Sequence, residues 1–237
     1  MAVNLALQLR EGTKKAHTMA ENTGFVSCFL KGVVDKASYR TLVGDLWFVY
    51  SAMEEEIGKL ADHPVVGPIG FPQLNRRAAL EQDLAFYFGS DWRSQVKATP
   101  GAQEYVARIH QVAEAAPELL VGHHYTRYIG DLSGGQILKN IAQKAMGLGE
   151  HDGLRFYEFD AIDDEKAFKA DYRTILDGLP IDQALADRIV EEANQAFHCN
   201  MKMFQELEGN LVAAIGKVLF GFLTRRIRGG STKAVVA

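Results

Sequence analysis

The C-terminal segment from Ile181 to Ile227 constrains the fold most strongly, because its apolar residues recur at helical spacing along most of its length. Recurrence at i, i+3, i+4 and i+7 predicts an amphipathic helix. Strand-like alternation is scarce elsewhere, and only the stretch from Phe156 to Phe159 reads as extended. The sequence therefore predicts an all-α protein of roughly eight helices. We expect one domain over residues 1–228 and a flexible tail over residues 229–237.

Composition narrows the class of protein. Hydrophobic residues make up 47% and charged residues 24% of the chain, the balance of an ordinary soluble globular protein. The net charge of -4 argues against a nucleic-acid partner. The two cysteines, Cys28 and Cys199, form no CxxC pair, so a zinc knuckle or a redox dithiol has no sequence signal. The N-terminus lacks a secretory signal, and the late apolar stretch around Lys217 is shorter than the about 20 residues of a membrane span. We therefore expect a cytoplasmic protein without a membrane anchor.

The first predicted helix, from Leu5 to Asn22, carries a polar stripe. At about 100° per residue, Arg10, Lys14, His17 and Glu21 fall on one narrow face. One interpretation of this stripe is a solvated charged surface with an incidental histidine. The alternative is that His17 is a metal ligand whose second ring nitrogen is held by Glu21. No second ligand shares the face at a suitable spacing, so a lone histidine points to heme iron, whose porphyrin supplies the in-plane ligands.

The sequence GDLSGG, at residues 130–135, interrupts a run whose flanks read as helix. Each glycine costs a helix interior about 1 kcal/mol relative to alanine. On a helical wheel one side carries the three glycines, one carboxylate and one cation: Gly130, Gly134, Gly135, Asp131 and Arg127. Such a flat side lets another helix or a flat ligand approach the backbone, or lets the helix bend. The motif fits neither a phosphate loop nor a nucleophile elbow. We favour a kinked helix lying across a flat ligand, and close helix packing is the alternative.

Four segments together resemble a known family: HTMAEN, YTRYIGDLSGGQ, FKADYR and AFHCNMKMFQELE. In order and spacing they resemble heme oxygenase over nearly the whole chain, and the N-terminal region is most similar to its cyanobacterial and algal branch. The resemblance implies a single all-α domain with heme b, both substrate and cofactor, between the first helix and the kinked glycine helix. It implies that O2 and electrons from reduced ferredoxin open the ring to biliverdin, carbon monoxide and ferrous iron. The family usually cleaves the α-meso carbon.

The same branch supplies biliverdin for bilin pigments. The resemblance therefore implies a downstream bilin reductase as a possible partner, and the cyanobacterial cytosol or the plastid stroma as the compartment. It further implies a monomer that lacks the C-terminal membrane anchor of the animal enzymes.

On the proximal side, His17 matches the family's iron ligand and Glu21 matches the residue that partners it. The residues that match or neighbour the heme propionate contacts are Arg10, Lys14, Tyr125, Lys169 and Arg173. Arg10 stands where the family often has lysine, which keeps the charge and changes the geometry. Phe197 and Phe204 match aromatic positions of the heme pocket, and ordinary core packing is the alternative for each.

On the distal side, Gly130 and Gly134 match the glycines that let the helix backbone approach heme, and Gly135 matches the glycine that helps the kink. Asp131 matches the distal acid, which holds an ordered water near bound oxygen. The other members of that water network match Tyr50, Arg127 and Asn200.

Two further classes stay open beside the enzyme: a heme carrier or sensor without turnover, and a structural helical bundle that binds no heme. The intact distal acid favours the enzyme. Ferredoxin is typically acidic, so we expect it to dock on a basic rim near the propionates that includes Lys15, Lys139 and Lys144. The remaining histidines that we weighed, His123, His124 and His198, are expected to be structural or exposed rather than ligands.

Overall fold

The computed structural model describes the backbone of residues 3–228 and the side chains of residues 3–207. The predicted all-α class is confirmed, because no strand occurs within residues 3–228. The tail predicted over 229–237 lies outside the described residues. The α-helices are α1 (Leu5–Gly12), α2 (Lys14–Glu21), α3 (Gly24–Leu30), α4 (Lys36–Lys59), α5 (Arg77–Phe88), α6 (Trp92–Gln95), α7 (Pro100–Ala115), α8 (Leu120–His124), α9 (Gly130–Met146), α10 (Glu165–Asp177) and α11 (Gln183–Arg228). Short 3-10 helices are η1 (Gly67–Ile69), η2 (Pro72–Leu74), η3 (Pro117–Leu119) and η5 (Arg155–Tyr157), and η4 (Tyr125–Ile129) is a π-helix.

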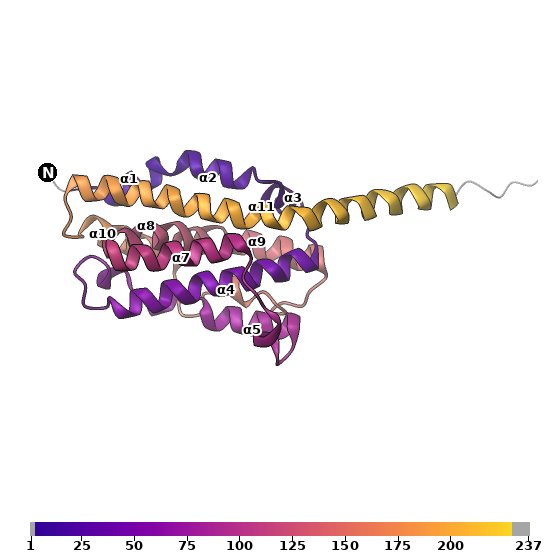
Figure 1. Cartoon of the computed structure of the whole chain (residues 1–237), viewed down its shortest axis with the longest axis horizontal. Helices are drawn as coiled ribbons and strands as arrows, with labels where there is room; N and C mark the ends of the chain where they lie inside the picture. Colours follow the sequence, from indigo (N-terminus) through magenta and orange to yellow (C-terminus); the bar gives the residue numbers. More distant parts are fainter. Residues whose placement is uncertain (1–2, 229–237) are drawn as a thin grey trace, which may run out of the picture.

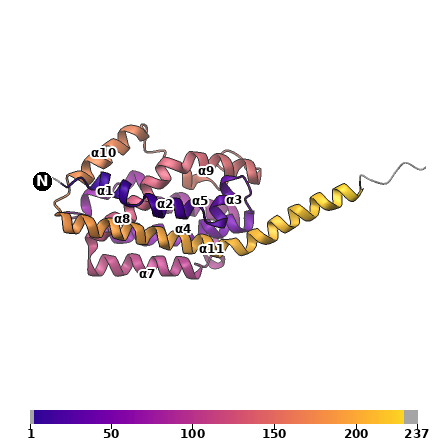
Figure 2. The same cartoon turned by 90° about the horizontal axis from the view of Figure 1, so that it is seen from above.

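The body of the molecule is a bundle in which α4 packs against α5 and α7, and α11 packs against α7 and α8 (Figure 1). Helices α1, α2 and α3 lie along α11 on the outside of this bundle. Seen from above, α9 and α10 run along one edge and α7 along the opposite edge, with α1 and α2 between them (Figure 2). The C-terminal half of α11 continues beyond the body in both views. This arrangement leaves α2 and α9 as outer helices, each exposing one face.

Apolar side chains from most helices form one continuous core. Helix α4 contributes a buried face that includes Val49, Tyr50 and Met53, and α11 contributes Ile189 and Ala193. At about 25 cal/mol per Å² of apolar surface removed from water, this shared core provides the main driving force for folding. The core therefore fixes α4, α7, α8 and α11 as the frame on which α2 and α9 are mounted.

The predicted first helix is in fact two helices. The chain breaks at Thr13, whose hydroxyl donates to the Leu9 carbonyl at 2.7 Å. Gly12 comes so close to α11 that a Cβ at this position would collide with Val190. The break thus follows from a contact with a helix that lies far away in the sequence.

The extended segment predicted at Phe156–Phe159 is wrong for Phe156 and Tyr157, whereas the backbone of Glu158 is extended. Residues Arg155–Tyr157 form the 3-10 helix η5. The backbone N–H groups of Arg155 and Phe156 donate to the two carboxylate oxygens of Asp83, each at 2.8 Å. The buried carboxylate therefore accepts both backbone N–H groups, and no neighbouring strand is needed to pair with them.

A π-helix precedes the glycine cluster. The five residues of η4 form it directly before Gly130, and α9 is regular from there onward. A π-turn inserts an extra residue into the helical ladder and is a recognised cause of kinks. The irregular turn therefore lies directly before the glycines rather than among them.

Candidate functional site

Helix α2 presents His17 to the outside of the fold. The helix is anchored on α11 through Ala16 and Ala20, which are buried. The His17 side chain is 58% exposed, and its Nδ1 lies 3.7 Å from the Glu21 carboxylate. Its ring meets the edge of Phe197 on α11 at 5.8 Å. His17 is thus steered by packing on one side while its ring remains accessible for a ligand.

The glycines of α9 fall into two environments. A Cβ added to Gly130 or Gly134 would meet no atom within 4 Å, whereas one added to Gly135 would lie 3.4 Å from the Tyr157 ring. Gly135 is buried and Gly130 is exposed, so the prediction that all three glycines share one flat face is wrong for Gly135. No helix of the described chain packs on Gly130 or Gly134. Close helix packing therefore does not explain these two glycines, and the face that they form is open to a ligand.

A buried polar network stands behind this open face. The Tyr50 hydroxyl donates to Asp131 and accepts from Arg127 Nε at 3.1 Å. The other guanidinium nitrogens of Arg127 donate to Asn200 Oδ1 at 2.9 Å and to Asp131 Oδ1 at 3.3 Å. The four side chains come from α4, η4, α9 and α11. The structure thus brings together, through direct hydrogen bonds, the four residues that the resemblance groups around the distal acid.

The electrostatics of this network centre on Asp131. Burial raises the pKa of Asp131 well above its ordinary value. Its neighbour Tyr50 is fully buried, and Arg127 is nearly so. Burial disfavours the charged form of a carboxyl group. The carboxyl of Asp131, oriented by Tyr50 and Arg127, is placed for proton transfer beside the open glycine face.

Cations gather at one end of the same region. Burial raises the pKa of Tyr125, and the charges of Arg173 and Arg10 oppose that rise, so both guanidinium groups lie within electrostatic reach of the phenol. Arg10 is 73% exposed and its Nε lies 3.9 Å from Glu11. Arg10, Tyr125 and Arg173 therefore converge from α1, η4 and α10 and can bind an anionic group.

The two predicted lysines of this group have acidic neighbours of their own. Lys14 pairs with Glu11, and Lys169 lies 3.6 Å from Glu165. Lys14 remains largely exposed in this pair, so it stays free to move to an incoming anion. Each lysine lies four residues before or after one of these arginines in the sequence. Unlike Arg10 and Arg173, neither lysine affects the pKa of Tyr125.

The two predicted pocket aromatics differ. Phe197 contacts His17, as described above. Phe204 stacks on the buried Phe25 at 6.0 Å and packs against the hydrophobic core. Phe197 therefore lies directly at the candidate site, whereas packing in the core accounts for Phe204.

The other histidines occupy structural positions or the surface. His123 lies 2.9 Å from the buried Glu192, and His124 lies 2.7 Å from the Tyr172 hydroxyl. Burial lowers the pKa of His124 to about 3, which keeps it neutral. His198 is exposed and lines a groove of about 860 Å³ between α7 and α11. Within the part of the chain whose side chains are described, no cluster of three or more His, Cys, Asp or Glu residues could hold a metal ion.

One predicted docking residue is not available at the surface. Lys139 Nζ lies 2.7 Å from Glu158, and the two side chains are only 13% and 7% exposed. The expectation that Lys139 belongs to an outer basic rim is therefore wrong. Lys15 and Lys144 are exposed, as that expectation requires.

The sequence reasoning missed the residues that support α9 from its buried side, namely Tyr157, Glu158 and Asp83. Their partners lie between about twenty and more than seventy positions away in the sequence. The only signal for these residues in the sequence is the run of aromatic and acidic residues after α9, whose pattern predicts an extended segment.

Comparison with known proteins identifies the family. The family model described as heme oxygenase matches residues 3–206. The chain is 66% identical to heme oxygenase 1 of Synechocystis over 238 residues, covering 100% of this chain and 98% of that protein. It is 61% identical to heme oxygenase 1 of Nostoc, covering 100% of both. The red alga Porphyra purpurea has a heme oxygenase that is 48% identical, covering 100% of this chain and 99% of that one.

Solved structures agree with this result. The crystal structure of heme oxygenase-1 from Synechocystis in complex with heme superposes with a TM-score of 0.91 at 66% identity, covering 93% of this chain and 100% of that one. The structure of heme oxygenase-2 from the same organism, in complex with heme and NO, gives 0.89 at 46% identity and covers 94% and 93%. No helix among the described residues is both long and apolar enough to cross a membrane. With its fold, its histidine on α2 and its glycine face on α9, the chain belongs to the heme oxygenase family.

Proposed function

We propose that this chain binds heme between α2 and α9 and cleaves it to biliverdin, carbon monoxide and ferrous iron. The observation that carries the proposal is the open backbone at Gly130 and Gly134, next to the buried carboxyl of Asp131. Bound heme would supply an iron that binds dioxygen, and its porphyrin would be the ring that is opened. The side chains of this chain would hold the ring, orient it and deliver protons.

The residues present fit this ligand. His17 on α2 offers an imidazole nitrogen to the iron, and the nearby Glu21 carboxylate, 3.7 Å from its Nδ1, can orient the ring directly or through one water. Gly130 and Gly134 allow a flat macrocycle to contact the backbone of α9, because no atom lies within 4 Å of either Cβ position. One helix therefore offers a ligand atom and the other offers a flat surface.

The propionates of heme would be bound by the cations at the end of the site. Arg10, Tyr125 and Arg173 are grouped there, and Lys14 and Lys169 can join them by leaving their pairs with Glu11 and Glu165. Charge-assisted hydrogen bonds from arginine to a carboxylate are among the stronger polar contacts and also fix orientation. These residues would therefore determine which edge of the ring points outward.

Asp131 would deliver protons on the distal side through an ordered water. Burial raises its pKa, and its hydrogen bonds with Tyr50 and Arg127 fix its orientation. Asn200 in turn holds Arg127. Because delivery occurs at one place on the ring, we propose cleavage at a single meso carbon, the α carbon, with reduced ferredoxin as the electron donor. We further propose that the biliverdin feeds bilin synthesis in a cyanobacterial or plastid compartment.

Heme titration followed by turnover tests the proposal. Heme added to the purified chain should give a saturable Soret band. Air, NADPH, ferredoxin and its reductase should then convert that band into biliverdin absorbance with release of carbon monoxide. The variant Asp131→Ala should still bind heme and should lose biliverdin formation. A Soret band without biliverdin in the unaltered chain would indicate a carrier or sensor, and the absence of any Soret band would indicate a structural bundle.

A further inference from the structure

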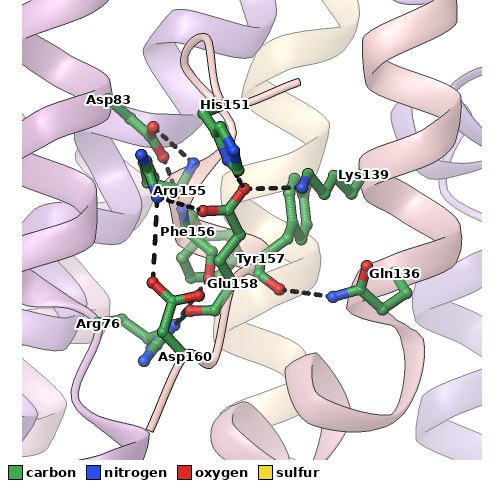
Figure 3. A network of polar contacts seen from close by, with 10 residues as sticks. All are labelled: Arg76, Asp83, Gln136, Lys139, His151, Arg155, Phe156, Tyr157, Glu158 and Asp160. Carbon is green, nitrogen blue, oxygen red and sulfur yellow. Dashed lines mark hydrogen bonds and ion pairs between the residues drawn. The ribbon is translucent and has the colours of Figure 1, made fainter. Parts of the chain in front are cut away.

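A segment that the heme site does not use connects α9 to the body of the protein. It runs from Gly153 to Phe159, includes η5, and lies between α9 and α5 (Figure 3). We refer to residues 153–159 as the strap. Helix α9 packs chiefly against η4, η5 and α3 rather than against the central helices of the bundle. The strap is therefore one of the few elements that hold α9 in place.

The strap is fastened firmly to the body. Asp83 on α5 accepts the N–H groups of Arg155 and Phe156 at 2.8 Å each. Arg76, at the start of α5, donates to the carbonyls of Phe156 and Glu158 and lies 3.8 Å from the centre of the Phe159 ring. Asp83 and Arg76 are both buried, so these contacts are shielded from solvent and hold the strap against α5.

The strap is fastened to α9 at three places that follow Gly134 in the sequence. Gly135 packs against the Tyr157 ring, Gln136 Nε2 donates to the Tyr157 carbonyl at 3.1 Å, and Lys139 pairs with Glu158 at 2.7 Å. Figure 3 shows Gln136 and Lys139 reaching toward the strap from the same helix. These contacts lie on a different face of α9 from the open glycines.

The ion pair is the only charged contact among these three fastenings. Glu158 also accepts from His151 at 2.7 Å and from Arg155 at 2.8 Å, so one carboxylate joins α9, the loop before the strap and the strap itself. Burial raises the pKa of Glu158, but the hydrogen bonds from Lys139 and His151 outweigh burial and leave the pKa below its ordinary value. Since both partners are nearly buried, the pair is shielded from the solvent that weakens exposed ion pairs.

We propose that Lys139 and Glu158 form a positioning pair that fixes the distal helix over the heme, and thereby the place on the ring where Asp131 acts. This inference rests on the proposed function. Lys139 lies eight residues after Asp131, about 12 Å along the helix at 1.5 Å per residue, and its buried pair with Glu158 faces the strap rather than the open glycines. Loosening α9 would shift Asp131 relative to Tyr50 and Arg127 and would let the ring tilt beneath Gly130 and Gly134.

Amide hydrogen exchange on the full chain without heme tests the mechanical half of the proposal. Lys139→Met and Glu158→Gln each remove one charge; glutamine matches glutamate in length, and methionine keeps most of the length of the lysine side chain. Each should raise exchange across residues 130–146 by about tenfold, with little change in α4 and α7. The double variant should go no further than Glu158→Gln alone, because that substitution already removes the pair with Lys139 along with the charged contacts to His151 and Arg155. Lys139→Arg should behave like the unaltered chain.

An exposed pair supplies the matched control. Lys202 on α11 pairs with Glu104 on α7, and both side chains are about half exposed. Lys202→Met should leave exchange in α9 unchanged. If Lys139→Met and Glu158→Gln leave exchange in α9 unchanged, or raise it equally in α4 and α7, the pair has only a general structural role and the proposal is overturned.

The isomers of biliverdin test the chemical half. With heme loaded, the unaltered chain, Lys139→Arg and Lys202→Met should each give one isomer, while Lys139→Met and Glu158→Gln should give a mixture at similar heme occupancy. A single isomer from both of the last two variants would overturn the proposal. If the unaltered chain makes no biliverdin, the proposed function fails, and the exchange comparison still decides whether the pair fixes α9.

Discussion

At the scale of single residues, Gly134 has opposite effects on folding and on ligand binding. Nothing lies within 4 Å of its Cβ position, and its backbone is helical. In the chain without heme, Gly134→Ala should therefore gain about 0.5–1 kcal/mol, which would raise the melting temperature by about 1–4 °C. The same methyl group would stand on the face where the ring binds, so the affinity for heme should fall. Calorimetry and heme titration measure the two effects separately.

Gly122 provides the control for this reasoning. A Cβ there would lie 2.7 Å from the Ile189 carbonyl and 2.8 Å from the Ala193 nitrogen, so Gly122→Ala should destabilise the chain with or without heme. If Gly134→Ala also lowered the melting temperature of the heme-free chain, the glycine would have a packing role inside the protein. The open-face interpretation would then be wrong.

His17→Ala should alter the coordination of heme without affecting the fold. The imidazole is more than half exposed and contacts mainly Phe197 and Glu21, so its loss costs little packing. We expect weak or altered heme absorption and loss of turnover, with partial recovery when imidazole is added to fill the space. His198→Ala, at an exposed histidine on α11, should match the unaltered chain in both assays. Full turnover and an unchanged heme spectrum in His17→Ala would rule out this ligand.

At the same scale, periodicity anticipated some neighbours and not others. It placed His17 and Glu21 on one face, and the structure brings them within 3.7 Å of each other. It also grouped Gly135 with Gly130 and Gly134, which is wrong, because Tyr157 from a later segment covers Gly135. A helical wheel gives angles around one helix but does not say which other elements cover each side.

At the scale of elements, the sequence predicted helices well and their interruptions poorly. The break at Thr13 depends on Val190 in α11, and the 3-10 turn η5 depends on Asp83 in α5. Both causes lie more than seventy residues away from their effects. The π-helix at Tyr125–Ile129 has no sequence signature that we used. Local propensity could not reveal these features, because the energy that creates them comes from tertiary contacts.

Helices α7, α8 and α11 are joined by one buried carboxylate, which makes a stability prediction possible. Burial raises the pKa of Glu192, but hydrogen bonds from His123 at 2.9 Å and Arg108 at 2.8 Å outweigh it and lower the pKa to about 2. A lowered pKa in the folded state means that the stabilisation is complete above the ordinary pKa of 4.5 and is lost as pH falls toward 2. Glu192→Gln should therefore reduce the free energy of unfolding by about 2–3 kcal/mol at pH 7.

Urea denaturation at pH 7 and at pH 3.5 measures this effect. The difference between the unaltered chain and Glu192→Gln should be smaller at pH 3.5, where part of the Glu192 population is protonated in the unfolded state. Glu104→Gln, at an exposed acid of α7, should change little at either pH. A difference that stays constant between the two pH values would contradict the lowered pKa.

At the scale of the whole molecule, the all-α class and the single helical domain could be read from the sequence, because helical periodicity persists along nearly the entire chain. The candidate site could be anticipated in part. The four members of the distal network come from α4, η4, α9 and α11, and only the family resemblance grouped them before the fold did. Neither helical periodicity nor the family resemblance predicted the strap, because the role that we propose for it depends on where α9 lies relative to α5.

Docking of the proposed electron donor depends on how charge is distributed over the whole surface. The chain carries a net charge of -4, so overall attraction cannot guide an acidic ferredoxin, and a local cationic surface must do so. Arg10 and Lys14 are largely exposed, and Lys15 beside them is exposed as well. We expect the ferredoxin-supported rate to fall steeply as salt rises, since the screening length is about 8 Å near physiological ionic strength.

Charge reversal separates docking from heme binding. Lys15→Glu should raise the KM for ferredoxin several-fold and leave heme affinity nearly unchanged, because Lys15 is outside the group that we assign to the propionates. Lys97→Glu is the matched control: this lysine is exposed, and it lies in the segment between α6 and α7. It should leave the KM unaltered. Lys139 is unsuitable for this test, because reversal there would break its buried pair with Glu158 and disturb α9. A rate that does not depend on salt, together with an unchanged KM in Lys15→Glu, would exclude docking at this surface while leaving the heme chemistry intact.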